Sequence, residues 1–201
     1  MKGLFVRLLF VSMGIVALAG PASAALNVVT TSAPQINCVF STTCSVTVTD
    51  MSAPIFNGGF VQSRVFQGQP GSPAAGKWVY EYRVSLTNSI GIGSQNWVKQ
   101  LIVPFGPIQS YDYNFDSNAT DQVFVVTQGG LGNIGLSSAG TLYGIVGFNF
   151  SPNIYEGDNQ TPGDSSYFVG IVSPYAPHVV NATIATSAGN QTVSVYAPTN
   201  P

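Results

Sequence analysis

Hydrophobic and polar residues alternate along much of the chain, most clearly between Trp78 and Leu86. In this segment apolar or aromatic side chains occupy every second position, while Glu81 and Arg83 fall on the opposite face. A period of two is typical of a strand with one buried face. A shift by one residue would bury both charges and expose three aromatic rings, so the pattern also fixes the register of this strand.

Shorter segments of the same kind recur along the chain, separated by clusters of Gly, Pro, Asn and Ser. We expect strands at 26–31, 44–50, 78–86, 97–105, 122–127, 142–150, 166–173, 179–186 and 191–197. Residues 52–76 are the weakest part, a Gly- and Pro-rich loop with one further strand around Phe60 to Phe66. No long segment has the period of an amphipathic helix. The pattern predicts an all-β fold, a single antiparallel and jelly-roll-like β-sandwich of about nine strands.

The first 24 residues have the features of a secretory signal peptide. Lys2 and Arg7 precede an apolar run over residues 8–18, and small residues ending at Ala24 follow it. We therefore expect cleavage after Ala24 and one secreted domain over residues 25–201. The apolar run is shorter than the roughly 18 residues that a membrane-spanning helix needs. No other stretch approaches that length, so no transmembrane segment is expected in the mature chain.

Charged residues are scarce. Only 7% of the residues are Asp, Glu, Lys or Arg, whereas about 25% are charged in ordinary soluble domains. Loss of the signal peptide would leave four basic residues beside eight acidic ones. This number is too small for a basic patch that binds nucleic acid or an anionic membrane surface. Polar but uncharged side chains must supply most of the surface, which suits contact with neighbours or polysaccharide without charge repulsion.

The two cysteines, Cys38 and Cys44, are separated by five residues. These five residues can form a tight hairpin loop that places the thiols side by side, and export implies an oxidising compartment. We predict an intrachain disulfide, which should add roughly 2–3 kcal/mol of stability. The alternatives are a redox, metal-binding or intermolecular role. A four-ligand zinc site from both cysteines and the single His178 would need a carboxylate as well.

An acidic loop is the best candidate for a binding site. Oxygen-bearing side chains stand at alternate positions in this loop, a pattern that can curl around a hard cation such as Ca²⁺. The candidate ligands are Asp112, Asn114, Asp116, Asn118 and Asp121. The loop departs from the EF-hand pattern, since Ser117 replaces the turn glycine and Val123 the last glutamate. The alternative is a loop whose Asp and Asn side chains bond their own backbone.

Two motifs of enzymes occur in an unsuitable context. The segment Gly130-Leu-Gly132-Asn-Ile-Gly135 matches a dinucleotide-binding fingerprint. The residues after it are expected to form a strand, not the helix that would bind the pyrophosphate. Ser137 or Ser165 together with His178 could belong to a hydrolase, but we expect no strand-to-helix elbow around either serine. We predict no cofactor other than the candidate Ca²⁺.

Carbohydrate chemistry has only weak support in the sequence. A glycosidase needs two facing carboxylates, and an ordinary surface ion pair with Arg83 accounts for Glu81, which leaves Glu156 alone. Exposed aromatic rings such as those of Trp78 and Trp97 could stack on sugars. Most aromatic residues of a β-sandwich belong to its core, however. We therefore expect a protein that is not an enzyme.

Two segments resemble a known protein family. They are Gln122-Val-Phe-Val-Val-Thr-Gln-Gly-Gly-Leu-Gly and Gly163-Asp-Ser-Ser-Tyr-Phe-Val-Gly-Ile-Val-Ser. They resemble secreted bacterial β-sandwich proteins of the exosortase-sorted, PEP-CTERM-like type, in an extracellular domain of largely unassigned role. The likeness spans residues 78–190 and implies no catalytic residues. The C-terminal sorting tail of that family does not follow Tyr196, so sorting to the envelope by that route is not expected.

Together these features predict a secreted, non-enzymatic surface or extracellular-matrix protein that acts in adhesion or assembly. The expected partners are further copies of the chain or a surface polysaccharide. Strand addition at a sheet edge is one route to assembly. The segments Leu26–Thr31 and Thr192–Ala197 are the first candidates for it. The alternative is a carbohydrate- or calcium-binding module, and a secreted hydrolase is the third hypothesis.

Overall fold

The computed structural model describes residues 23–91 and 95–198 of the chain. Nearly all of the predicted signal peptide, residues 1–24, lies outside the described residues. The described residues form twelve strands in two six-stranded sheets, one short α-helix and one 3-10 turn, η1 (Phe56–Gly58). Within the described residues, no helix has the length and apolar character needed to cross a membrane.

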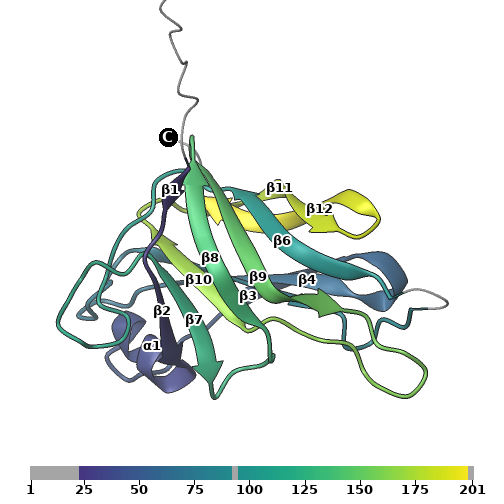
Figure 1. Ribbon diagram of the computed structural model, residues 1–201. Coiled ribbons are helices and arrows are strands. Elements are labelled where there is room, and N and C mark those ends of the chain that lie inside the picture. The colour runs from purple at the N-terminus through teal and green to yellow at the C-terminus, as the bar shows by residue number, and fades with distance from the viewer. Residues whose placement is uncertain (1–22, 92–94, 199–201) are drawn as a thin grey trace, which may run out of the picture.

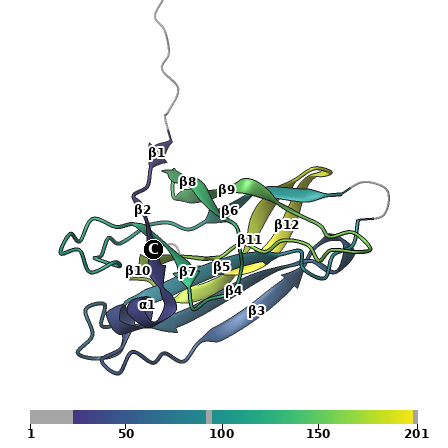
Figure 2. The same ribbon diagram turned by 60° about the horizontal axis from the view of Figure 1, so that its bottom comes forward.

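The two sheets pack against each other with a shared apolar core between them (Figure 1 and Figure 2). Sheet A contains, in spatial order, β1 (Ala24–Ala25), β8 (Gly135–Leu142), β9 (Ile145–Tyr155), β6 (Trp97–Pro104), β11 (Pro177–Thr186) and β12 (Gly189–Pro198). Sheet B contains β2 (Val28–Ser32), β7 (Val123–Gln128), β10 (Phe168–Ser173), β5 (Trp78–Ser85), β4 (Phe60–Gln67) and β3 (Thr49–Pro54).

The predicted all-β fold is confirmed, but three details are wrong. The described residues contain twelve strands, not about nine. Strand β2 pairs with β7 in parallel, whereas the other pairs between the named strands are antiparallel. The expected strand at 44–50 is also wrong, because regular pairing begins only at Thr49. The weakly predicted strand around Phe60 to Phe66 is present as β4.

The alternation between Trp78 and Leu86 forms β5, an inner strand of sheet B. Its aromatic face points toward sheet A, since Tyr82 is fully buried and its ring centroid lies 5.8 Å from that of Phe148 in β9. This confirms the predicted register. The opposite face of β5 is not open to water as predicted. Glu81 on that face is only 1% exposed, because a second layer covers sheet B.

This second layer is built on helix α1 (Ala33–Phe40). The helix directs Ile36, Val39 and Phe40 against the outer face of sheet B, where the loop before β7 adds Tyr113. Strand β10 is consequently buried along its whole length. Sheet A has no comparable layer among the described residues, and Figure 2 shows α1 on the sheet B side of the molecule. The two outer faces of the molecule therefore differ in exposure.

The start of α1 is determined by a local cap. The hydroxyl of Ser32 accepts a hydrogen bond from the backbone N–H of Gln35 at 3.3 Å, and Pro34 lies in the first turn. Both residue types favour a helix start. The periodicity of the sequence did not predict this helix, because eight residues are too few to show a clear period. The spacing of Ile36, Val39 and Phe40 and the Ser32 cap are the signals that could have found it.

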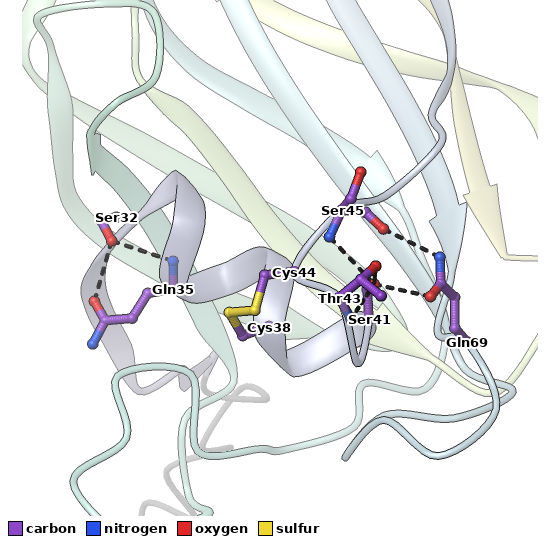
Figure 3. Close-up of a disulfide and its surroundings, with 8 residues drawn as sticks. All are labelled: Ser32, Gln35, Cys38, Ser41, Thr43, Cys44, Ser45 and Gln69. Carbon is purple, nitrogen blue, oxygen red and sulfur yellow. Dashed lines mark hydrogen bonds between the residues drawn. A yellow bond between two sulfur atoms is a disulfide. The ribbon is translucent and has the colours of Figure 1, made fainter.

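Cys38 and Cys44 form the predicted disulfide, with Cα atoms 4.1 Å apart. The hairpin expected around it is wrong, because Cys38 belongs to α1. Cys44 follows a turn and itself has a positive φ of 55°. Figure 3 shows the bridge at the end of the helix, near the side chain of Ser41. The Ser41 hydroxyl donates to Oε1 of Gln69 at 2.9 Å and accepts from the N–H of Ser45 at 3.2 Å. The disulfide and Ser41 together anchor the chain that leaves the helix.

Removal of the disulfide should destabilise the protein. The double variant Cys38→Ser/Cys44→Ser is expected to lose roughly 2–3 kcal/mol of unfolding free energy, because the unfolded chain regains the freedom of the closed ring. Urea denaturation of the variant and the wild type measures this loss. Wild-type protein in reductant should behave like the variant. Equal stability of the oxidised wild type and the variant would contradict the prediction.

Candidate functional site

The outer face of sheet A is open and nearly uncharged. The six strands of this sheet contain one Asp, Glu, Lys or Arg residue, Lys99 in β6. Burying a charge costs far more free energy than burying an amide or hydroxyl that finds a hydrogen bond. A partner can therefore cover this face at a low desolvation cost.

Strand register places small and uncharged residues in a row across this face. Facing positions on neighbouring strands, from β1 to β12, are Ala25, Gly140, Gly147, Ile102, Thr183 and Thr192. Gly140 and Gly147 face each other without side chains, and Ser23 and the Gln100 amide lie close to them. A shallow groove of about 190 Å³ lies over this pair.

The two sides of this groove differ in chemistry. Gln100 and Asn149 supply amide groups on one side, where the Asn149 amide donates to the Ser138 hydroxyl at 3.0 Å. Leu142 and Ile145 lie on the other side and are 37% and 45% exposed. Hydrogen-bonding groups beside apolar side chains suit an uncharged partner with both kinds of surface, such as a sugar polymer or another sheet.

Aromatic side chains lie at both ends of strand β9 in sheet A. Trp97 and Tyr155 face each other on β6 and β9, and Tyr155 is 38% exposed. Tyr143, in the turn between β8 and β9, is 82% exposed. Of the two tryptophans considered for sugar stacking, Trp78 instead packs against the core. Trp97 is therefore the tryptophan with access to a partner on sheet A.

Both segments suspected of strand addition lie at sheet edges. Strand β2 is an edge of sheet B, and β12 is an edge of sheet A. Part of the β12 edge is already bonded within the molecule. The N–H of Tyr196 donates to Ser63 Oγ at 2.9 Å, and its carbonyl accepts from Tyr82 Oη at 2.7 Å. Residues 189–194 are therefore the part of β12 better suited to pairing with another chain.

The acidic loop lies between β6 and β7. The Asp112 carboxylate accepts the backbone N–H groups of Asp116 and Ser117 at 3.0 and 2.8 Å, and Asp116 accepts that of Asn118 at 2.8 Å. These bonds are those of the alternative interpretation, in which side chains bond their own backbone. Among the described residues, no three His, Cys, Asp or Glu side chains gather where they could hold a metal ion. Calcium binding by this loop stays a prediction.

The last acid of the loop has a distinct environment. Asp121 is 2% exposed, and its carboxylate accepts the backbone N–H of Tyr113 at 3.0 Å. Burial raises the pKa of Asp121, the Tyr113 hydrogen bond opposes this, and the nearby charges of Asp116 and Asp112 add to the increase. This side chain therefore fixes the loop to the position where Tyr113 packs on sheet B.

The candidate hydrolase serines are in different sheets. Ser137 lies on β8 and donates to the backbone carbonyl of Asn149, whereas Ser165 precedes β10 and donates to that of Val84. His178 is the second residue of the long strand β11, and its Nδ1 is buried without a hydrogen-bond partner among the described residues. Each serine thus has a hydrogen bond within the fold. The glycine-rich motif forms the turn from β7 to β8, with a strand after it as expected.

The expected surface pair of Glu81 with Arg83 is wrong. Glu81 instead accepts a hydrogen bond from Nε of Arg64, which faces it on β4. Arg83 donates to Gln62 at 3.2 Å and to Ser165 at 3.4 Å. Facing residues on paired strands come closer than residues two apart on one strand. Burial raises the pKa of Glu81, and the charge and hydrogen bond of Arg64 offset part of that increase.

Glu156 is a structural carboxylate. It is 2% exposed and accepts hydrogen bonds from Ser89 Oγ at 2.7 Å, Asn57 Nδ2 at 2.9 Å and the backbone N–H of Asn96 at 2.8 Å. Burial alone would raise the pKa of Glu156, but the hydrogen bonds from Ser89, Asn96 and Asn57 outweigh it and lower the pKa. The side chain therefore ties together three connecting segments at one end of the sheets.

The chain matches no family model, no curated protein and no solved structure in the comparisons. The resemblance to exosortase-sorted proteins therefore stays a prediction. Arg64, which pairs with the buried Glu81 and lies over the Phe168 ring, was not singled out from the sequence. Its only signal was the scarcity of charge, which makes any buried ion pair in this chain notable.

Proposed function

We propose that this protein is a secreted, non-enzymatic surface or matrix protein that assembles with further copies of itself through the outer face of sheet A. The observation that carries the proposal is the composition of that face, whose six strands contain Lys99 as their one charged residue. Two copies can meet there without burying unpaired charges. The predicted signal peptide and the disulfide support an extracellular location.

A charge placed in the centre of this face tests the proposal. Thr183 lies in the row of small residues and faces Ile102. Thr183→Glu should convert assembled material to monomer, because assembly would then bury a carboxylate in every contact. The matched control is Thr47→Glu, on the exposed segment before β3, which should leave assembly unchanged. Size-exclusion chromatography and negative-stain microscopy of the native exported protein measure both effects.

The outcomes of this experiment are distinct. Wild-type protein that runs as a monomer and forms no filaments contradicts assembly. If Thr183→Glu and Thr47→Glu change assembly to the same extent, the contact between copies does not use the outer face of sheet A. The β12 edge would then be the next surface to test.

Polysaccharide binding on the same face is the second candidate. It is favoured by the amides of Gln100 and Asn149 beside the Gly140–Gly147 pair and by the exposed ring of Tyr155. Sugars present both hydroxyl groups and apolar faces, which match these side chains. A monomeric wild type that co-sediments with an insoluble polysaccharide, and a Thr183→Glu variant that does not, would favour this function over assembly.

A further inference from the structure

A second groove, of about 380 Å³, lies on the opposite side of the molecule, on the outer face of sheet B. Helix α1, the segment before β3 and the turn after β7 line it, and this turn lies against the start of α1 at Gly129. Most of its lining residues are apolar, including Ile36, Val48, Phe66, Val126, Leu131 and Phe168, although polar and apolar atoms contribute about equally to its accessible surface. Its volume falls in the range of roughly 300–1,000 Å³ that is typical of small-molecule sites. We name it the Arg64 groove after the one charged residue among its described lining residues.

Arg64 is held in this groove by two contacts. Its Nε donates to the buried carboxylate of Glu81, and its guanidinium carbon lies 3.7 Å from the ring centroid of Phe168. Within the described chain, the guanidinium makes no other side-chain hydrogen bond. The Arg64 side chain is 27% exposed, so the rest of its N–H groups are accessible from the groove. Contacts with Glu81 and Phe168 preorganise these donors before any ligand arrives.

A second guanidinium group lies beside the groove. Arg83 lies on the same side of sheet B, with its guanidinium carbon 5.4 Å from the centroid of the same Phe168 ring. Two guanidinium groups therefore lie near one aromatic ring, that of Phe168, while Glu81 pairs with Arg64. A chain with only six Lys and Arg residues places two of them here. The Arg64 groove therefore combines a cationic side chain with apolar lining residues.

The stability of the fold does not require a buried ion pair at this position. Well-packed apolar residues of similar size are often as stabilising or more so. The neighbouring positions on sheet B, such as Phe66 and Val79, are apolar. A requirement for a fixed cation in the groove explains why this chain has Arg64 and Glu81 at the centre of an apolar surface.

We propose that the Arg64 groove binds an alkyl carboxylate, with the carboxylate on the Arg64 guanidinium and the alkyl chain between α1 and Leu131. A guanidinium pairs with a carboxylate through two parallel hydrogen bonds, and its planar form suits a position over an aromatic ring. Leu131 and Val48 are 56% and 36% exposed at the rim, where an alkyl chain would cover them. This proposal is independent of the assembly surface on sheet A.

The test compares three small probes that bind to the purified full-length protein. Isothermal titration calorimetry with decanoate below its micellar concentration should give saturable binding. Decanol has the same chain without the charge, and acetate has the charge without the chain. Both should bind at least about tenfold more weakly than decanoate. Equal binding of decanol and decanoate, or no binding of decanoate, would overturn the proposal.

Two sets of variants locate the site. Leu131→Glu adds a negative charge at the exposed rim and should weaken decanoate binding by about tenfold or more. The matched control Leu142→Glu makes the same change on the outer face of sheet A and should leave the affinity unchanged. An unchanged affinity of Leu131→Glu, or an equal loss in the control, would overturn the assignment of the groove.

The double variant Arg64→Leu/Glu81→Leu tests the role of the cation. Because it removes both members of the ion pair, it leaves no unpaired charge at the groove floor. It should bind decanoate and decanol equally, whereas the wild type prefers decanoate. A preference for decanoate that persists in this variant would show that another group binds the carboxylate.

Discussion

Arg64→Leu is expected to lower the free energy of unfolding at pH 7 by about 3–5 kcal/mol, because the buried carboxylate of Glu81 loses its partner. Burial already raises the pKa of Glu81, and Arg64 lowers it again in part, so the substitution raises this pKa further. A carboxyl with a raised folded-state pKa loses stability as the pH rises from its unfolded pKa through the folded one. The deficit should therefore be smallest in acid and grow with pH. Urea denaturation between about pH 4 and pH 8 measures it.

Two further variants separate the lost ion pair from a simple loss of charge. Arg64→Leu/Glu81→Leu should recover most of the stability, since neither charge remains on the sheet. Lys77→Leu removes a partly exposed cation that forms no ion pair among the described residues, and it should change the stability by no more than about 0.5 kcal/mol. A double variant as unstable as Arg64→Leu alone would show that packing by Arg64, not its charge, stabilises this region.

Phe124→Ala is expected to cost about 3–5 kcal/mol, the range for the loss of a fully buried ring. The Phe124 ring centroid lies 5.0 Å from that of Tyr113 and 6.5 Å from that of Phe40. The ring also lies over Gly170, where a Cβ atom would come within 2.0 Å of it. The substitution therefore removes the centre of the layer between α1 and sheet B. Denaturation measures the total loss, and amide hydrogen exchange should show the largest loss of protection in α1.

The control for this variant is Phe115→Ala, because Phe115 is 48% exposed. It should change the stability by no more than about 0.5 kcal/mol. Equal losses from both substitutions would contradict the assignment of Phe124 to the centre of this layer. Protection lost evenly over both sheets, with none specific to α1, would show that the layer does not unfold as a separate unit.

The two outer faces of the molecule differ in a way that composition could only partly anticipate. Scarcity of charge predicted a polar, uncharged surface, and the strands of sheet A have that character. Strand β8 was expected only as part of the strand after the glycine-rich motif and not as a separate strand, since Gly135–Leu142 contains few of the bulky residues that mark strands. Its small residues are tolerated because one face of sheet A is open and needs no large side chains. The same small residues weakened the sequence signal for a separate strand and line the groove at Gly140 and Gly147.

The candidate sites differ in how far the sequence could reveal them. The acidic loop is local, so its alternating Asp and Asn residues were visible, and so was the chance that they bond their own backbone. The Arg64 groove is not local. Arg64 and Glu81 come from two strands, and the walls of the groove come from α1 and from the turn after β7. A one-dimensional pattern contains no information on which strand lies beside which.

The sequence by itself determined the β class, the register of β5, the cysteine pair and the low charge of the surface. Each of these depends on alternation, composition or short spacing, which are properties of neighbouring residues. The tertiary structure alone decided that α1 covers sheet B, that sheet A stays open and that Glu81 pairs with Arg64. These features arise from pairing between distant segments, where facing residues on adjacent strands come into contact whatever their separation along the chain.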